Sequence, residues 1–147
     1  MLSVPVHRID DDLPLPSYAK EGDAGADLYA RADVHLAAGG GRELVPTGIV
    51  VAIPRGHAGF VLPRSGLAMR HGVTCLNTPG LIDAGYRGEL RVLLVNTDPH
   101  EDYDVRRGDR IAQLVVQRVE HAAFAPVGEG DLPPAERGTG GFGHSGR

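Results

Sequence analysis

The sequence contains little of what disulfide-linked or metal-stabilised proteins require. Cysteine occurs once in the 147 residues, at Cys75, so no internal disulfide can form. No cysteine or histidine partner stands at the spacing of a zinc ligand set, so the sequence indicates no structural zinc site. Cys75 is therefore expected to be a small, buried, apolar side chain in a chain that folds around one hydrophobic core.

Long hydrophobic runs and an excess of positive charge are also absent. No apolar stretch approaches the length of a membrane span, and no basic segment followed by an apolar one opens the chain. We therefore expect a cytoplasmic protein with no membrane partner. The net charge of -4 argues against a nucleic-acid partner. All 15 basic residues except Lys20 are arginine, which suits bidentate phosphate binding but equally fits a compositional bias of the genome.

Several motifs of nucleotide-binding proteins and hydrolases are missing. The chain has no G-x-x-x-x-G-K-[ST] phosphate loop, no dinucleotide fingerprint after a strand, no H-E-x-x-H and no G-x-S-x-G turn. Any bound phosphates must therefore be held by arginines and loop amides. Attack by a water that a carboxylate activates is favoured over covalent catalysis.

The sequence does contain a series of short apolar segments separated by glycine and proline. Segments 42–54, 59–63, 89–96 and 110–120 are rich in valine, leucine and isoleucine and have the length of strands. No stretch keeps the 3.6-residue period of a long helix. The pattern predicts an all-β sandwich or jelly-roll-like barrel in a single domain, residues 1–132.

One short helix is expected in RSGLAMRHG at residues 64–72. Ser65 is its candidate N-cap and Gly72 its expected C-terminal stop. Leu67 and Met69 are the side chains that this helix is expected to bury.

The last segment, residues 133–147, is expected to be a mobile, glycine-rich C-terminal flap. Its end, RGTGGFGHSGR, resists a fixed conformation until something else holds it. Two interpretations stand side by side: a frayed end, or a flap that closes on a ligand. In the second, Arg137 and loop amides bind anionic oxygens and the Phe142 ring covers a flat apolar surface.

Two loops between the strands combine charged and polar residues with glycine turns. In PRSG at 63–66, the guanidinium of Arg64 and the hydroxyl of Ser65 lie at the expected helix start, where an anion is favoured. The alternative is that Ser65 is only a helix cap. In NTPGLIDAGYRGEL at 77–90, Asp83 stands between glycine turns, which predicts a carboxylate buried at the tip of a hairpin. The alternative is an aspartate that hydrogen-bonds its own turn.

A third loop, RRGDRIAQ at 106–113, begins a strand with a tight turn. It leaves Gln113 among apolar neighbours, where a polar amide is conspicuous. Arg110 and Asp109 are other polar residues of this loop, and a simple pair between them is the alternative interpretation.

Five segments together resemble, in order and spacing, the five motifs of the trimeric deoxyuridine triphosphatases. They are AGADLYA at 24–30, PRSGLAMRHG at 63–72, NTPGLIDAGYRGEL at 77–90, RRGDRIAQLVVQ at 106–117 and RGTGGFGHSG at 137–146. The resemblance implies a jelly-roll-like (β-clip) barrel that forms a homotrimer with sites shared between subunits. It implies hydrolysis of dUTP to dUMP and pyrophosphate with Mg2+, which keeps uracil out of DNA and supplies dUMP for thymidylate synthesis.

The resemblance assigns the base and sugar of the nucleotide to the hairpin. Asp83 takes the place of the catalytic carboxylate that accepts a proton from the water attacking the α-phosphorus, and burial beside its neighbours would raise its basicity. Tyr86 matches the ring that packs on the sugar and leaves no room for a 2′-hydroxyl. The uracil slot corresponds to Asn77 and to the hairpin backbone at Gly80, Leu81 and Ile82.

The resemblance assigns the phosphates to other loops. Gln113 matches the residue near the α-phosphate and the attacking water, and counts with Asp83 as catalytic. Asp27 matches an acid that either lies near the water shell of the metal or supports the site. Mg2+ is expected to be held by the phosphates and water, with no direct protein ligand. The remaining substrate contacts implied are Arg64, Ser65, Gly66, Arg91, Arg137, Phe142, His144 and Ser145.

Two rival functions of other classes are retained. A deoxycytidine triphosphate deaminase of the same fold carries its catalytic glutamate at the position that aligns with Leu93, which argues for hydrolysis. A non-catalytic nucleotide-binding trimer would keep the arginines but would not need a carboxylate at position 83.

Overall fold

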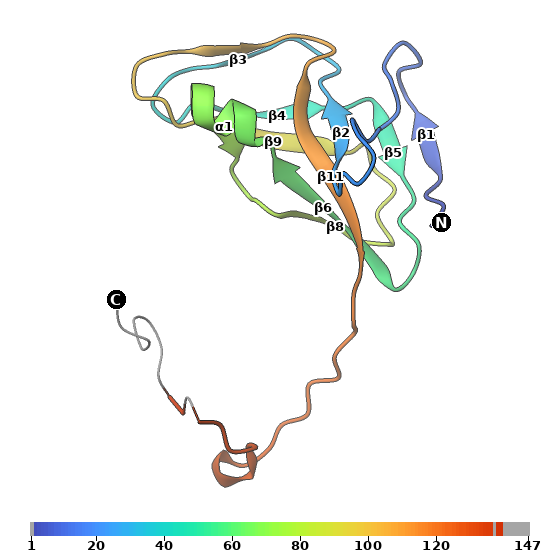
Figure 1. Cartoon of the computed structure of the whole chain (residues 1–147), viewed down its shortest axis with the longest axis vertical. Coiled ribbons are helices and arrows are strands. Elements are labelled where there is room, and N and C mark those ends of the chain that lie inside the picture. The colour runs from blue at the N-terminus through green and yellow to red at the C-terminus, as the bar shows by residue number, and fades with distance from the viewer. Residues whose placement is uncertain (1, 137, 140–147) are drawn as a thin grey trace.

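The computed structural model describes residues 2–136, 138 and 139 and is built almost entirely of short strands (Figure 1). Within these residues there is one α-helix and one 3₁₀ helix, which agrees with the all-β prediction. The elements are β1 (Val6–Arg8), β2 (Ala26–Tyr29), β3 (Val34–Leu36), β4 (Arg42–Pro46), β5 (Ile49–Val51), β6 (His57–Pro63), α1 (Ser65–His71), β7 (Val73–Cys75), β8 (Gly80–Ile82), β9 (Arg91–Asn96), β10 (Tyr103–Val105), β11 (Arg110–Arg118) and η1 (Glu129–Asp131).

All strand pairs are antiparallel. The largest sheet has the order β2-β11-β6-β8, and a second has the order β4-β9-β7. Strands β1 and β5 form one further pair and β3 and β10 another. In the largest sheet β11 pairs with β6 from Ala112 opposite Pro63 to Arg118 opposite His57, so this pair forms its centre. Strands β2 and β8 are its edges.

One cluster of buried side chains joins these sheets. Leu28 of β2, Val61 of β6 and Leu114 of β11 belong to the same cluster as Val45 of β4 and Leu94 of β9. Burying this much apolar surface away from water is the main force that holds the sheets together.

Cys75 belongs to this core, and 2% of its surface is exposed. Burial raises the pKa of its thiol to about 11, so the side chain stays neutral at physiological pH. The expectation of a small buried apolar residue is confirmed.

The segment that reads as continuous in the sequence at 42–54 is divided into β4 and β5. Thr47 and Gly48 separate the two strands, and Gly48 has φ 74°, a left-handed conformation that glycine adopts without strain. The division lets β4 pair with β9 while β5 pairs with β1, so one stretch of chain serves two sheets.

The helix α1 begins and ends almost where the sequence predicts. Gly72 closes it at φ 64°, with its N–H donating to the Ala68 carbonyl at 3.1 Å, and Leu67 is buried. Two expectations are wrong. Arg64, not Ser65, occupies the N-cap, and Met69 is 87% exposed. Residues two apart on a helix differ by about 200°, so Leu67 and Met69 cannot both face the core.

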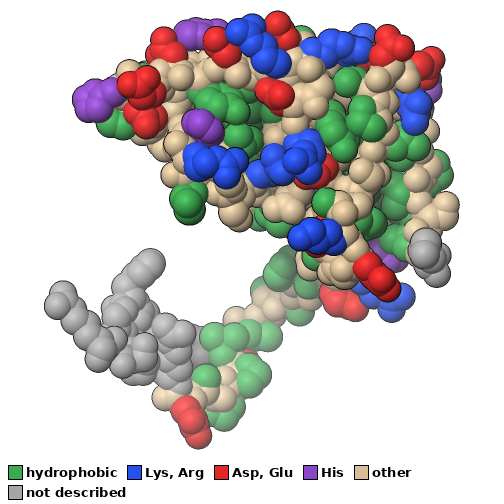
Figure 2. Space-filling view, turned by 45° about the horizontal axis from the view of Figure 1, so that its top comes forward, with side chains coloured by type: hydrophobic (Ala, Val, Ile, Leu, Met, Phe, Trp, Pro, Cys, Tyr) green, Lys and Arg blue, Asp and Glu red, His purple; other side chains and the backbone are tan. Residues whose placement is uncertain are grey.

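The chain leaves the body after β11 as an extended arm (Figures 1 and 2). The N–H of Val119 donates to the Gly56 carbonyl at 3.0 Å, the last backbone hydrogen bond between the arm and the body within the described residues. Beyond it, Phe124 is 95% exposed, and Val127 and Leu132 are exposed as well. Such apolar side chains on an unsupported arm are what a contact with another molecule would cover.

Across residues 2–136, 138 and 139, no helix has the length and apolar character needed to cross a membrane.

Candidate active site

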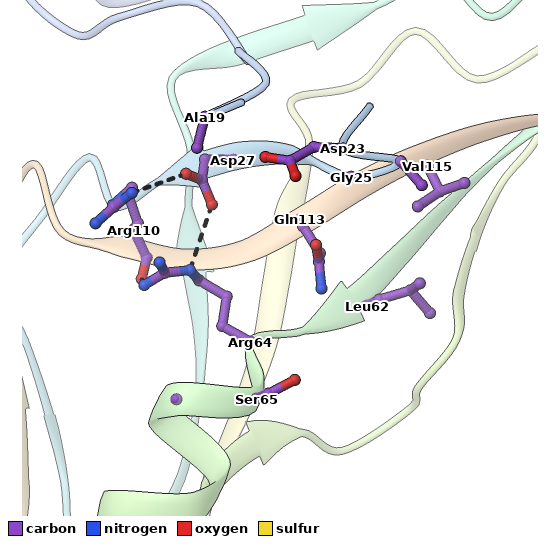
Figure 3. Close-up of a pocket in the computed structure, with 12 residues that line it drawn as sticks. Ala19, Asp23, Gly25, Asp27, Leu62, Arg64, Ser65, Arg110, Gln113 and Val115 are labelled. Atoms are coloured by element: carbon purple, nitrogen blue, oxygen red, sulfur yellow. Dashed lines mark hydrogen bonds and ion pairs between the residues drawn. The ribbon is translucent and has the colours of Figure 1, made fainter. Parts of the chain in front are cut away.

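A cavity of about 450 Å³ opens where β2, β6 and β11 meet the first turn of α1 (Figure 3). Glycine and small residues before β2 form one wall, and the end of β6 forms another. The lining residues are Ala19, Asp23, Ala24, Gly25, Asp27, Leu62, Arg64, Ser65, Gly66, Arg110, Gln113 and Val115.

Two arginines converge on one carboxylate in this cavity. Nε of Arg64 lies 3.3 Å from Oδ1 of Asp27, and an Nη atom of Arg110 lies 3.1 Å from Oδ2 of the same residue. The Asp27 side chain is only 14% exposed, whereas those of Arg64 and Arg110 are 28% and 48% exposed, so a covered carboxylate holds two guanidinium groups that stay open to the cavity (Figure 3). The alternative of a pair between Arg110 and Asp109 is wrong, because Arg110 pairs with Asp27 and the Asp109 carboxylate accepts a hydrogen bond from the backbone N–H of Arg106 at 2.8 Å.

Gln113 reaches the same cavity from β11. It stands opposite Asp27 of β2 and Leu62 of β6, and its Nε2 donates to the Pro63 carbonyl at 3.0 Å. That bond uses one N–H of the amide and leaves Oε1 as an acceptor. A Cβ atom at Gly25 would lie 2.9 Å from Cδ of Gln113 and 3.0 Å from its Cβ, so the glycine makes the room that this side chain occupies.

Arg110 was missed as a site residue because its position depends on an irregularity in β11. In a regular strand, residues three apart point to opposite faces. The pairing of β11 with β2 shifts register between Arg110 and Ala112, however, so Arg110 and Gln113 both line the cavity. No sequence pattern identifies such a bulge. Asp23 was missed too, and its carboxylate accepts the N–H of Lys20 at 2.8 Å.

The first turn of α1 supplies backbone donors at the cavity. Ser65 and Gly66 line it, and the turn's hydrogen bonds run from the N–H groups of Leu67 and Ala68 to the Arg64 carbonyl. The N–H groups of Ser65 and Gly66 precede these bonds, so the helix itself does not use them. Together with the two guanidinium groups and the Gln113 amide, they make a cavity suited to anionic oxygens.

The hairpin at residues 77–90 lies apart from this cavity. Its strand β8 is an edge of the large sheet, with Gly80 opposite Val61 and Leu81 opposite Phe60. Leu81 is 58% exposed, and Asp83 is exposed too. The expected burial of the Asp83 carboxylate is therefore wrong for a single chain, because nothing in the described part of this chain covers the turn beyond the edge strand.

The turn after Asp83 is closed by the backbone. The N–H of Tyr86 donates to the Asp83 carbonyl at 3.0 Å, and the Tyr86 hydroxyl donates to the Glu89 carbonyl at 2.9 Å. The hydrogen bonds among the described residues include none to the Asp83 carboxylate, so the aspartate does not cap its own turn in the way the alternative interpretation required.

The structure thus separates the predicted site residues into two groups. Asp27, Arg64, Ser65, Gly66 and Gln113 share the cavity. The second group, on the hairpin and the start of β9, does not line it: Asn77, Gly80, Leu81, Ile82, Asp83, Tyr86 and Arg91. The predicted residues Arg137, Phe142, His144 and Ser145 lie outside the described residues.

The cavity alone can bind an anionic ligand. Asp27 is engaged by two guanidinium groups, whereas Asp23 accepts one backbone N–H and keeps lone pairs free for a water. Activation of a water needs a carboxylate that can accept its proton. Asp83, exposed at the tip of its hairpin, is a further candidate for that role.

Comparison with known proteins identifies relatives along nearly the whole chain. A family model described as dUTPase matches residues 11–146. The chain is 59% identical over 143 residues to a deoxyuridine 5'-triphosphate nucleotidohydrolase of Thermobifida fusca, covering 97% of this chain and 78% of the relative. It is 56% identical over 147 residues to the protein of the same name from a Mycobacterium species, covering 98% and 95%.

Solved structures agree with this assignment. A variant of the dUTPase of Staphylococcus bacteriophage 80alpha, solved with dUpNHpp, superposes with a TM-score of 0.87 at 26% identity over the full length of both chains. A dUTPase variant from phage phi11 of S. aureus, described with a coordinated structural Mg(II) ion, has a TM-score of 0.78 at 23% identity and covers 89% of this chain and 100% of its own. The predicted jelly-roll fold is confirmed.

Proposed function

The chain belongs to the dUTPase family, and we propose that its site hydrolyses dUTP to dUMP and pyrophosphate by attack of an Asp83-activated water on the α-phosphorus. The observation that carries this proposal is that the groups suited to phosphate and the proposed general base lie in two separate regions of the chain. One region presents two fixed guanidinium groups and unused backbone N–H donors that suit phosphate, and another presents an exposed carboxylate beside the expected uracil slot.

The two regions form one site when the hairpin of one subunit faces the cavity of a neighbour. We propose a homotrimer in which this happens at each interface. The exposed Leu81 and the exposed apolar side chains of the arm support it, because both gain cover from a neighbour. In the assembled site, the neighbouring subunit would cover Asp83, which is exposed in the single chain.

The hairpin selects the nucleotide. Uracil would meet fixed backbone donors and acceptors at residues 80–82, beside Asn77, so cytosine would place like groups against each other. Tyr86, whose hydroxyl is tied to the Glu89 carbonyl, would lie against the sugar and leave no room for a ribose 2′-hydroxyl. Thymine would need space for an extra methyl in a closely packed hairpin.

The cavity holds the phosphates. Arg64, Ser65 and Gly66 would bind their oxygens, Gln113 would orient the water near the α-phosphate, and Arg91 would add a further contact. Asp27 holds Arg64 and Arg110 in place, which supports its role as a residue that organises the site. The C-terminal residues Arg137, Phe142, His144 and Ser145 would close over the nucleotide.

The residues of the cavity are compatible with the magnesium ion expected for this family, provided that the nucleotide and not the protein ligates it. Among the described residues no three histidine, cysteine or acidic side chains gather to hold a metal ion, and the Asp27 oxygens already face two guanidinium groups. We propose that the phosphates and water ligate Mg2+, with Asp27 and Asp23 able to accept hydrogen bonds from its waters. When bound, the ion neutralises phosphate charge and withdraws electrons from phosphorus.

The proposal places the enzyme in the cytoplasm, where removal of dUTP keeps uracil out of DNA and the product dUMP feeds thymidylate synthesis. A deaminase is disfavoured because Leu93, where that branch carries its glutamate, is an apolar residue of β9.

A single assay separates the candidate functions. The protein is incubated with Mg2+ and dUTP, dCTP, dTTP or UTP, and pyrophosphate and ammonia are measured. We expect pyrophosphate from dUTP and little from the other three. Ammonia from dCTP would instead identify a deaminase, and nucleotide binding without any product would identify a non-catalytic binding protein.

Gly25→Ala tests the position of Gln113. The new methyl would collide with the Gln113 amide, which can rotate away but then loses its bond to the Pro63 carbonyl. We expect kcat for dUTP to fall by about 10- to 100-fold, because a small misplacement of a positioning group is costly. The melting temperature should fall as well, because rotation of the amide does not relieve the 3.0 Å approach to Cβ of Gln113.

Gly130→Ala is the matched control, since a Cβ at that position meets no atom within 4 Å. A wild-type kcat in Gly25→Ala would show that catalysis does not depend on the observed position of the Gln113 amide.

A further inference from the structure

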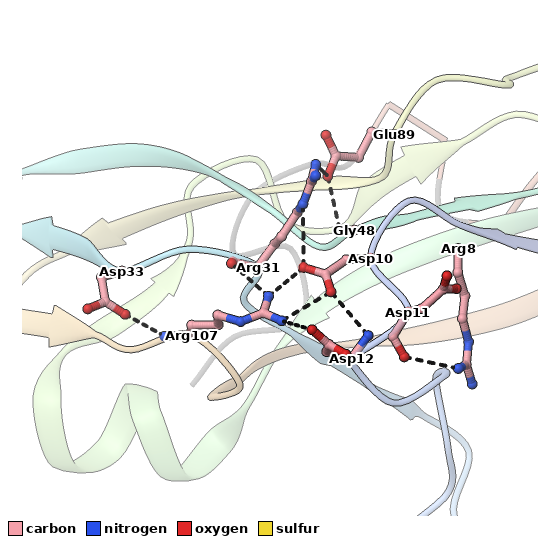
Figure 4. A network of polar contacts seen from close by, with 9 residues as sticks. All are labelled: Arg8, Asp10, Asp11, Asp12, Arg31, Asp33, Gly48, Glu89 and Arg107. Atoms are coloured by element: carbon pink, nitrogen blue, oxygen red, sulfur yellow. Dashed lines mark hydrogen bonds and ion pairs between the residues drawn. The ribbon is translucent and has the colours of Figure 1, made fainter.

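Glu89 lies near the end of the hairpin segment, and its side chain contacts other parts of the fold (Figure 4). Its Oε1 accepts a hydrogen bond from the N–H of Gly48 at 2.9 Å and lies 3.4 Å from an Nη atom of Arg31. The side chain is 12% exposed. A carboxylate so nearly buried is costly unless it is paired, so these contacts hold it in one place.

The same residue contacts both substrate-facing side chains of its segment. Its backbone carbonyl accepts the hydroxyl of Tyr86 at 2.9 Å, and its Oε2 lies 3.6 Å from Nε of Arg91. Gly88 contributes by being small, because a Cβ there would lie 2.7 Å from Cζ of Tyr86. The Tyr86 ring therefore lies directly over the backbone that leads into Glu89.

A second carboxylate, Asp10, is nearly as buried as Glu89 and also pairs with Arg31, but its other contacts differ. Asp10 is 15% exposed, lies 3.6 Å from Nε of Arg31, and accepts from Arg107 at 3.0 Å (Figure 4). The hydrogen bond from Arg107 lowers the pKa of Asp10 below its usual value. Asp10 touches neither Tyr86 nor Arg91, so it joins the N-terminal loop to the body without reaching the hairpin.

We propose that Glu89 is a positioning residue for the substrate: its side chain, anchored to Gly48 and Arg31, fixes Arg91 directly and Tyr86 through the backbone. The inference rests on the proposed function, in which Tyr86 faces the sugar and Arg91 contacts dUTP. Selection against ribonucleotides thereby depends on Gly48 and Arg31, which anchor Glu89 but do not contact the nucleotide in the proposed site.

The test compares Glu89→Gln with Asp10→Asn. Each change removes one carboxylate charge paired with Arg31, so both are expected to lower the melting temperature. Only Glu89→Gln is expected to raise KM for dUTP, by about 5- to 20-fold, and to lower the ratio of kcat/KM for dUTP to that for UTP by a similar factor. A purely structural role would leave that ratio unchanged.

A double-mutant cycle identifies the route of the effect. In an Arg91→Ala background, Glu89→Gln should add little to KM but should still lower the dUTP to UTP ratio through Tyr86. An unchanged ratio in Glu89→Gln, or an equal change in Asp10→Asn, would overturn the positioning role while dUTP hydrolysis by the wild type stands. If the wild type does not hydrolyse dUTP, the proposed function itself is wrong and this inference with it.

Discussion

Asp83→Asn is expected to lower the turnover of dUTP by about 10² to 10⁴, or roughly 3 to 5 kcal/mol of barrier, while leaving dUTP affinity almost unchanged. The amide has the size of the carboxylate and keeps the turn, whose closing bond runs from the Tyr86 N–H to the Asp83 backbone carbonyl. It cannot accept a proton from water at neutral pH. Single-turnover kinetics and calorimetric titration with a non-hydrolysable dUTP analogue measure the two quantities separately.

Asp11→Asn is the matched control, because Asp11 is also an exposed aspartate and lies outside the proposed site. It should retain wild-type turnover. Turnover near the wild-type value in Asp83→Asn would remove this residue from the role of general base and return the non-catalytic or deaminase alternatives to consideration.

Mixing inactive subunits should restore activity if the hairpin and the cavity of one site belong to different chains. Asp83→Asn subunits keep an intact cavity, and Arg64→Ala subunits keep an intact hairpin. When equal amounts are unfolded and refolded together, random assembly gives about a quarter of the sites an intact hairpin facing an intact cavity. The mixture should therefore recover up to about a quarter of wild-type activity, although each parent is nearly inactive.

Native mass spectrometry of the mixture establishes that mixed assemblies have formed. Refolding Asp83→Asn with wild type provides the reference, since about half of its sites should be active. Mixed assemblies with activity at the parental level would mean that one chain supplies both parts of its own site, contrary to the sharing proposed here.

The sequence allowed the class of fold to be predicted because strand length, apolar content and glycine or proline turns are local properties. Gly72 ends α1 where its lack of a Cβ favours a left-handed residue. The buried Leu67 was predicted correctly, whereas Met69 was not, since two residues two positions apart cannot share one helix face.

The site was less accessible from sequence because it depends on geometry between elements. The partners of Arg110 and Asp109 are set by a register shift in β11 and by the turn before it. The exposure of Asp83 depends on what covers an edge strand, which no local pattern encodes. The role of Gly25 also appears only when β2 and β11 are placed side by side.

Asp27 holds the two guanidinium groups of the cavity in fixed places before any ligand arrives. Within the described lining of the cavity, Arg64 and Arg110 are balanced by Asp23 and Asp27, so the formal charges sum to zero. An anion that enters this lining therefore meets oriented donors without a net positive charge. Within the lining, the direction of the hydrogen bonds, rather than the amount of charge, decides which anion fits.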